Sequence, residues 1–168
     1  MLYFSYGSNM SSKRLKERVP SAYYVTVATL LKHELRFHKK SLDGSGKCDA
    51  YETGKDDHQI MGVVFELAKL EKPKLDIKEG LGKGYEEKLV NLVSQSGEHI
   101  EALTYYATSI DKTKKPYHWY KQHVINGAEE FGLPEEYIEK IRSTESIVDN
   151  EPGRHELELS IYATKRVR

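Results

Sequence analysis

The apolar pattern of this chain changes its period about two thirds of the way along, and that change constrains the fold more than any other feature. In the first part, short apolar runs alternate with polar, glycine-containing stretches, which is typical of strands and turns. The strands that this pattern predicts lie at residues 2–6, 22–37 (one strand or two), 59–67, 85–93 and 100–108, the last two joined as a hairpin at Ser96-Gly97.

In the last third, apolar and aromatic residues recur every three or four positions, which predicts helices. Residues 117–131 form one amphipathic stripe, and Gly132-Leu133-Pro134 ends that helix and begins another. Several strands followed by a helical pair predict an α+β fold, with the sheet curled or closed like a barrel around a centre.

Two short helices are expected among the strands. Residues 11–19 form the first, with Asn9 or Ser11 as its N-cap. Residues 73–79 form the second, and Gly80 lies just past its end.

Three segments carry no helical signal. Residues 39–58 are polar and contain three glycines, which predicts an exposed loop. Residues 143–156 also resemble a loop. Residues 157–163 fit either a final strand or a loose tail.

Length and charge narrow the class of protein. The 168 residues fit a single domain over residues 1–168. Because 26 basic residues balance 26 acidic ones, no basic excess points to nucleic acid or to an anionic membrane as a partner.

No apolar run approaches the roughly 20 residues that span a bilayer, and the first residues lack the pattern of a signal peptide. Cys48 is the only cysteine, which rules out an intramolecular disulfide. A cytoplasmic protein is expected.

Motifs for nucleotides and metals are incomplete. Gly44-Ser45-Gly46-Lys47 ends like a phosphate-binding loop, but Ser41 stands where the first glycine is required. The seven histidines form no metal-ligand pair, since His118 and His123 are five positions apart, and all seven are expected at the surface. We therefore expect no metal and no cofactor.

Two local features can carry chemistry. The first is the segment from Tyr3 to Asn9, where a strand runs into a Gly-Ser-Asn turn and then into a helix. Backbone N–H groups of such a turn can bind an anion, and Gly7 allows the backbone to approach a ligand closely. The alternative is an ordinary tight turn with a helix cap.

The second feature is Glu79. It lies one helical turn after Leu75, so both side chains are expected on the face that points inward. A carboxylate partly removed from water holds a proton more readily and can act as a general base or acid near neutral pH. The alternative is a solvated glutamate at a helix end.

Together these residues resemble the γ-glutamylcyclotransferase family, within the wider AIG2-like superfamily. The resemblance runs from residue 3 to residue 141 and rests on Tyr6-Gly7-Ser8-Asn9-Met10, Arg18-Val19-Pro20-Ser21-Ala22, Gly62-Val63-Val64-Phe65, Leu75-Asp76-Ile77-Lys78-Glu79-Gly80, and the stretch from Tyr120-Lys121 to Gly132-Leu133-Pro134.

The resemblance implies a small closed sheet with a pocket at its mouth, and release of 5-oxoproline and a free amine from a γ-glutamyl compound without metal or cofactor. It implies that Glu79 is catalytic. The implied substrate-binding residues are Tyr3, Phe4, Ser5, Tyr6, Gly7, Ser8, Asn9, Tyr85, Tyr105 and Tyr120.

Several alternatives stay open at this point. The leaving group can be an amino acid or an amine, although Asn9 argues against the glutathione-specific branch, which usually has an apolar residue there. The same fold can also serve as a non-catalytic module that binds a small molecule. A third reading is an interaction protein, in which the stripe at residues 117–131 forms a homodimer.

Overall fold

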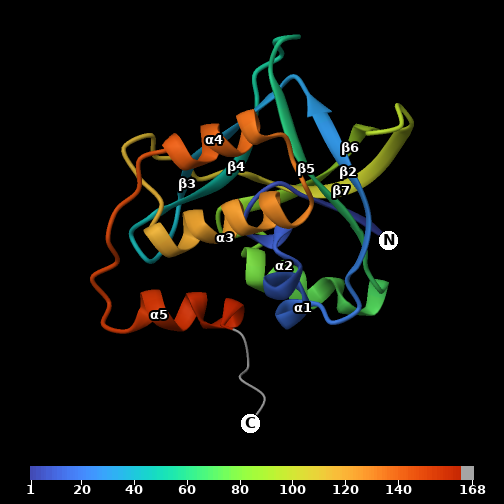
Figure 1. Ribbon diagram of the computed structural model, residues 1–168. Coiled ribbons are helices and arrows are strands. Elements are labelled where there is room, and N and C mark those ends of the chain that lie inside the picture. The colour runs from blue at the N-terminus through green and yellow to red at the C-terminus, as the bar shows by residue number, and fades with distance from the viewer. Residues whose placement is uncertain (164–168) are drawn as a thin grey trace.

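Five strands close into a barrel in the computed structural model, which describes residues 1–163 (Figure 1). Around the barrel they follow the order β1 (Leu2–Ser5), β5 (Gln59–Glu66), β2 (Tyr23–Leu31), β6 (Tyr85–Ser94) and β7 (His99–Ala107). Neighbours are antiparallel except β1 and β7, whose parallel pairing of Tyr3 with Leu103 closes the ring. The α+β prediction is confirmed, and the sheet is closed.

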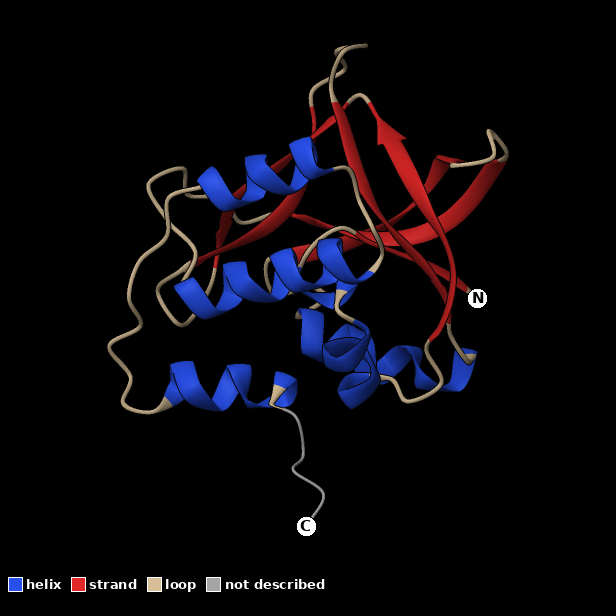
Figure 2. Cartoon of the chain, in the orientation of Figure 1, coloured by secondary structure: helices blue, strands red, loops and turns tan. Residues whose placement is uncertain are grey.

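Helices flank this barrel, and in the view of Figure 2 they lie to the left of the strands and below them. α1 (Ser12–Arg18) follows the short 3-10 helix η1 (Ser8–Met10), and α2 (Lys72–Glu79) follows another, η2 (Lys69–Glu71). The last third contains α3 (His118–Glu130), α4 (Glu135–Ser143), α5 (Arg154–Leu159) and the 3-10 turn η3 (Ser160–Tyr162). None of the helices within residues 1–163 is long and apolar enough to cross a membrane.

The two short helices begin and end within one residue of the predicted bounds. The backbone N–H of Arg14 donates to Oγ of Ser11 over 3.5 Å, so Ser11 is the N-cap of α1 and the Asn9 side chain is left for other contacts. Gly80 ends α2 with a φ of 77°, a left-handed conformation that glycine adopts without strain.

The prediction of an exposed loop over residues 39–58 is wrong. This segment contains β4 (Gly46–Glu52), which pairs with β3 (His33–Lys40) in a separate two-stranded sheet. Gly46, which suggested a loop, is required by close packing: a Cβ there would lie 2.1 Å from the carbonyl oxygen of Phe37. β4 also contains Asp49, a charged residue that suggests an exposed loop. Asp49 is nevertheless buried, and it accepts a hydrogen bond from the backbone N–H of Ala107 at 2.7 Å.

The apolar face of α3 is covered by the chain itself. Val124 and Ala128 are fully buried. Gly127 packs on η1 so closely that a Cβ would lie 2.4 Å from the backbone nitrogen of Ser11. The stripe considered as a dimer face is therefore occupied within one chain.

The C-terminal segment is helical, so neither a final strand nor a loose tail describes residues 157–163. α5 begins at Arg154, inside the segment expected as a loop, and η3 follows it. α5 has only six residues, and its Leu157 is 71% exposed. The sequence therefore shows no periodic apolar face that would predict a helix here. Tyr162 instead anchors the segment, since its hydroxyl donates to Oγ of Ser11 at 2.9 Å.

The expectation that all histidines lie at the surface is wrong for three of them. His33, His38 and His123 are buried, and each has a hydrogen-bond partner. His38 Nε2, for example, lies 2.8 Å from Oδ2 of Asp49. Buried polar groups are normally paired, and the side-chain partners of His38 and His123 lie 11 and 39 residues away, where a spacing rule does not reveal them.

Candidate active site

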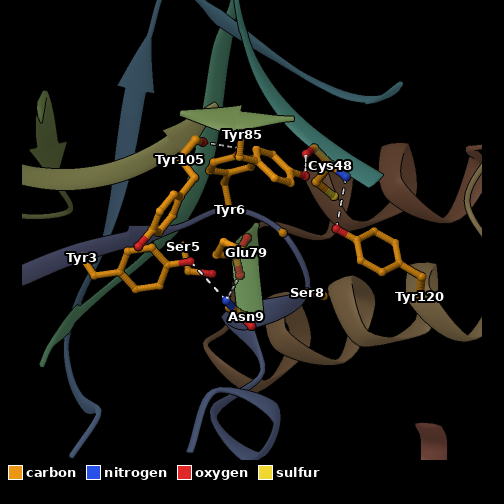
Figure 3. Close-up of a pocket in the computed structure, with 11 residues that line it drawn as sticks. Tyr3, Ser5, Tyr6, Ser8, Asn9, Cys48, Glu79, Tyr85, Tyr105 and Tyr120 are labelled. Carbon is orange, nitrogen blue, oxygen red and sulfur yellow. Dashed lines mark hydrogen bonds between the residues drawn. The ribbon is translucent and has the colours of Figure 1, made fainter. Parts of the chain in front are cut away.

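A small pocket opens where β1 passes into η1 (Figure 3). The residues that line it are Tyr3, Ser5, Tyr6, Gly7, Ser8, Asn9, Cys48, Glu79, Tyr85, Tyr105 and Tyr120. The fold thus gathers around one cavity every predicted site residue except Phe4. Since successive residues of a strand point to opposite faces, Tyr3 and Ser5 reach the cavity while Phe4 is fully buried in the core beside Gly62.

Glu79 is fixed in this cavity by two donors. Its Oε1 accepts a hydrogen bond from Nδ2 of Asn9 at 2.5 Å and another from the Arg18 guanidinium at 3.4 Å. Arg18 also donates to Oδ1 of Asn9 at 3.1 Å, which orients the amide so that Nδ2 faces Glu79. The Glu79 side chain is only 16% exposed. Its second oxygen, Oε2, accepts no hydrogen bond within residues 1–163, so it is available to a ligand that carries a proton.

The β1–η1 segment that lines this cavity also holds unpaired polar groups. Within residues 1–163, the backbone N–H groups of Gly7 and Ser8 donate to no oxygen. Oγ of Ser5 is buried and also lacks a partner. Because unpaired polar groups cost free energy when water is excluded, the Ser5 hydroxyl and these two N–H groups favour a polar ligand in the cavity.

Tyrosines form the cavity wall and hold one another in place. Burial raises the pKa of Tyr3, Tyr6, Tyr85, Tyr105 and Tyr120, so their hydroxyls stay protonated. The Tyr6 hydroxyl donates to the carbonyl oxygen of Tyr105 at 2.5 Å. The Tyr105 hydroxyl donates to Asp76 at 2.5 Å. The hydroxyls of Tyr6 and Tyr105 are therefore oriented by partners within the chain.

Cys48 is a lining residue that sequence reasoning missed. Its carbonyl oxygen accepts from the Tyr85 hydroxyl, and its N–H donates to the Tyr120 hydroxyl at 3.1 Å. Burial raises the pKa of the thiol to about 12, so Cys48 is not a thiolate nucleophile. A Cβ on Gly7 would lie 3.0 Å from Cβ of Cys48, which explains the glycine in the turn.

Arg18 and Asp76 were also missed as site residues. Asp76 lies one turn before Glu79 on α2, and that spacing is the one signal that the sequence offered. No group of three or more His, Cys, Asp or Glu side chains in the described part of the chain is placed to hold a metal ion.

A half-buried carboxylate beside unpaired backbone donors, in a pocket lined by polar and aromatic side chains, is the arrangement expected of an enzyme site for a small molecule. Comparisons identify the family. The AIG2-like family matches residues 59–141. The gamma-glutamylcyclotransferase of Bos taurus is 34% identical over 150 residues, which cover 86% of this chain and 78% of that protein. The Homo sapiens protein of the same name is 33% identical over the same shares. A solved gamma-glutamyl cyclotransferase structure superposes with a TM-score of 0.86 at 30% identity, covering 96% of this chain and 98% of the other. This chain therefore belongs to the γ-glutamylcyclotransferase family.

Proposed function

We propose that this protein cyclises the γ-glutamyl group of a small γ-glutamyl compound to 5-oxoproline and releases the free amine, with Glu79 as general base and acid. One observation carries the proposal: Oε2 of Glu79 is free within residues 1–163, in the cavity that the unpaired N–H groups of Gly7 and Ser8 adjoin. The relatives that bear the name of this activity support it.

The reaction begins with a proton transfer to Glu79. Its carboxylate takes a proton from the α-ammonium of the substrate, and the neutral α-nitrogen attacks the γ-carbonyl carbon of the same molecule. The attack closes a five-membered ring. Intramolecular attack in a correctly folded substrate gains effective concentrations of about 10⁵–10⁸ M, so a positioned base is the main further requirement.

The second half of the reaction returns the protons. Glu79 gives its proton to the leaving nitrogen as the carbon–nitrogen bond breaks, and the ring nitrogen loses a second proton by the same route. Two protons leave the α-nitrogen and two reach the leaving amine, so Glu79 ends the cycle ionised. Substrate and carboxylate account for every bond, and the cycle as proposed needs no cofactor.

The β1–η1 segment stabilises the charge that develops. When the ring closes, the carbonyl oxygen becomes negative, and the N–H groups of Gly7 and Ser8 are donors free to meet it. Tyr120 keeps its proton for a ligand, since its oxygen accepts from Cys48. The remaining tyrosines shape the wall that holds the glutamyl part.

Release of 5-oxoproline tests the proposal. We expect the wild-type protein to release it from γ-glutamyl amino acids, and the assay follows 5-oxoproline and the free amine by chromatography. Equal amounts of the two products are expected. Binding of these compounds without any release would instead indicate a non-catalytic module.

A substitution at Ser5 should affect substrate binding without lowering the stability of the fold. Replacing Ser5 by alanine removes a hydroxyl that has no partner in the described chain, so the free energy of unfolding should stay constant or rise by up to about 1 kcal/mol. The KM should rise about two- to tenfold, because a substrate group loses its hydrogen bond. Urea denaturation and steady-state kinetics measure the two effects.

Ser94→Ala is the matched control. Ser94 is also buried but paired, since its Oγ accepts from the backbone N–H of Glu98 at 3.1 Å. This variant should lose about 1 kcal/mol of stability and keep its KM. An unchanged KM in Ser5→Ala would show that the hydroxyl does not touch the substrate.

A further inference from the structure

Glu79 stands at the end of a helix that has little apolar contact with the core. α2 has eight residues, and Leu75 is the only one of them that is buried. Ile77, on the other side of the helix, is 79% exposed. Asn9 and Arg18 orient the carboxylate of Glu79, but apolar packing at one point does not fix the direction of the helix beneath it. Other contacts must hold α2 in place.

Four polar side chains join α2 to the barrel in a closed ring. The Tyr105 hydroxyl, on β7, donates to Oδ1 of Asp76 at 2.5 Å. Lys72, one turn earlier on α2, donates to both oxygens of Asp76 at 2.7 and 2.8 Å and pairs with Glu87 of β6 at 2.5 Å. Glu87 and Tyr105 are themselves direct partners across β6 and β7. We call these four residues the α2 clamp.

The α2 clamp is a network of partly buried charges. Tyr105 is buried, and the side chains of Lys72 and Asp76 are less than one quarter exposed. Burial lowers the pKa of Lys72, but its bonds to Asp76 and Glu87 outweigh that effect and raise the pKa, so the ammonium stays charged. Isolated ion pairs at a surface contribute little, whereas hydrogen bonds to charged groups within a network hold their geometry more firmly.

Asp76 connects the α2 clamp to Glu79. It lies three residues before Glu79, and residues at that spacing are neighbours on a helix surface. Its backbone carbonyl oxygen accepts from the N–H groups of Gly80 at 2.9 Å and of Leu81 at 3.0 Å. The residue that the clamp holds therefore also ends the helix directly after Glu79. A rotation of α2 at Asp76 would move the Glu79 carboxylate with it.

Tyr105 contributes to the site in two separate ways. Its ring lines the pocket and lies edge-on to the ring of Tyr3, with centres 5.9 Å apart (Figure 3). Its hydroxyl has one proton, and that proton is donated to Asp76. The ring thus shapes the pocket wall, while the hydroxyl acts on α2.

We propose that Asp76 is a positioning residue: through the α2 clamp it holds Glu79 where proton transfer requires it, and the Tyr105 hydroxyl acts through Asp76 instead of on the substrate. This inference rests on the proposed function and adds two positioning groups to the same site. A general base must lie within hydrogen-bond reach of the proton it takes, and a displacement of about 1 Å can cost about 10²-fold in rate.

Two substitutions of Asp76 test its role. Asp76→Ala should lower kcat for γ-glutamyl-alanine about 10- to 100-fold, while KM stays within about threefold, because Asp76 does not line the pocket. Asp76→Asn keeps an oxygen that can accept from Tyr105 and Lys72, so its kcat should stay within about threefold of the wild type. Circular dichroism at the assay temperature gives the folded fraction by which each kcat is normalised.

Lys74→Ala is the matched control on the same helix. Lys74 pairs only with Glu71 of η2, at 3.6 Å, and this pair does not reach the barrel. The variant loses an ion pair of α2 but keeps the α2 clamp. Its kcat and KM should equal those of the wild type.

A double-mutant cycle tests the role of the Tyr105 hydroxyl. Tyr105→Phe alone should lower kcat, because Asp76 loses a donor. In the Asp76→Ala background the same substitution should lower kcat by less than about twofold, since groups that act through one contact are not additive.

Four outcomes would overturn the inference. A wild-type kcat in Asp76→Ala would show that the clamp does not position Glu79. A loss in Asp76→Asn as large as in Asp76→Ala would show that the accepted hydrogen bond is not what matters. Full multiplication of the two effects in the cycle would place the Tyr105 hydroxyl on the substrate. Absence of 5-oxoproline release from the wild type would overturn the proposed function and this inference together, whereas the first three outcomes leave cyclisation intact.

Discussion

Replacing Glu79 by glutamine should lower kcat for 5-oxoproline release by about 10²- to 10⁴-fold, the range that a general acid–base group contributes. Glutamine has the same shape, and its amide oxygen can still accept from Asn9 and Arg18, as Oε1 does now. It cannot take the proton of the α-ammonium at the position of Oε2. The variant should therefore fold and bind substrate while losing the proton transfer.

Steady-state kinetics and a thermal melt measure these two properties. Glu86→Gln is the matched control, since Glu86 is exposed on β6 and makes no ion pair in the described chain. It should keep both kcat and the melting temperature. If Glu79→Gln kept the wild-type kcat, the assignment of Glu79 as the base would be wrong.

Replacing Gly127 by alanine should lower the free energy of unfolding by about 2–3 kcal/mol. The usual effect has the opposite sign, because alanine inside a helix is better than glycine by about 1 kcal/mol. Here the new Cβ would lie 2.4 Å from the backbone nitrogen of Ser11 and 2.6 Å from Cβ of Met10. Neither atom is the end of a flexible side chain, so α3 and η1 must move apart.

The same movement should reduce activity, because η1 carries Asn9, which fixes Glu79. Urea denaturation gives the stability, and the 5-oxoproline assay gives kcat. Gln122→Ala, on the same helix, is the control, and its free energy of unfolding should stay within about 0.5 kcal/mol of the wild type. A Gly127→Ala variant as stable as the wild type would show that the helix packing adapts to the added carbon.

The sequence predicts the elements whose pattern is local. The barrel strands and α3 have a clear period of apolar residues, and α2 has a proline at its start and Gly80 at its end. β4 escaped prediction because its burial depends on a partner for Asp49 some 58 residues later. α5 escaped because it is short and is held by Tyr162 and Glu158 through contacts distant in sequence.

The residues of the candidate site also fall into those that local sequence predicts and those that it does not. The turn after β1 and the helix end at Glu79 are local features, and the resemblance linked them. Arg18 and Cys48 reach the site only through the closure of the fold, from segments that the sequence describes as a basic helix and a polar loop. No spacing rule connects residues that meet only through tertiary structure.

The place of β1 in the barrel has a consequence for synthesis of the chain on the ribosome. β1 is the first strand to be made, yet one of its two partners is β7, where Leu103 follows Tyr3 by 100 residues. Until β7 has emerged, the nascent β1 lacks one neighbour and the ring stays open. The turn that carries Gly7 and Ser8 must wait with it, so the growing chain gains its pocket only late in translation.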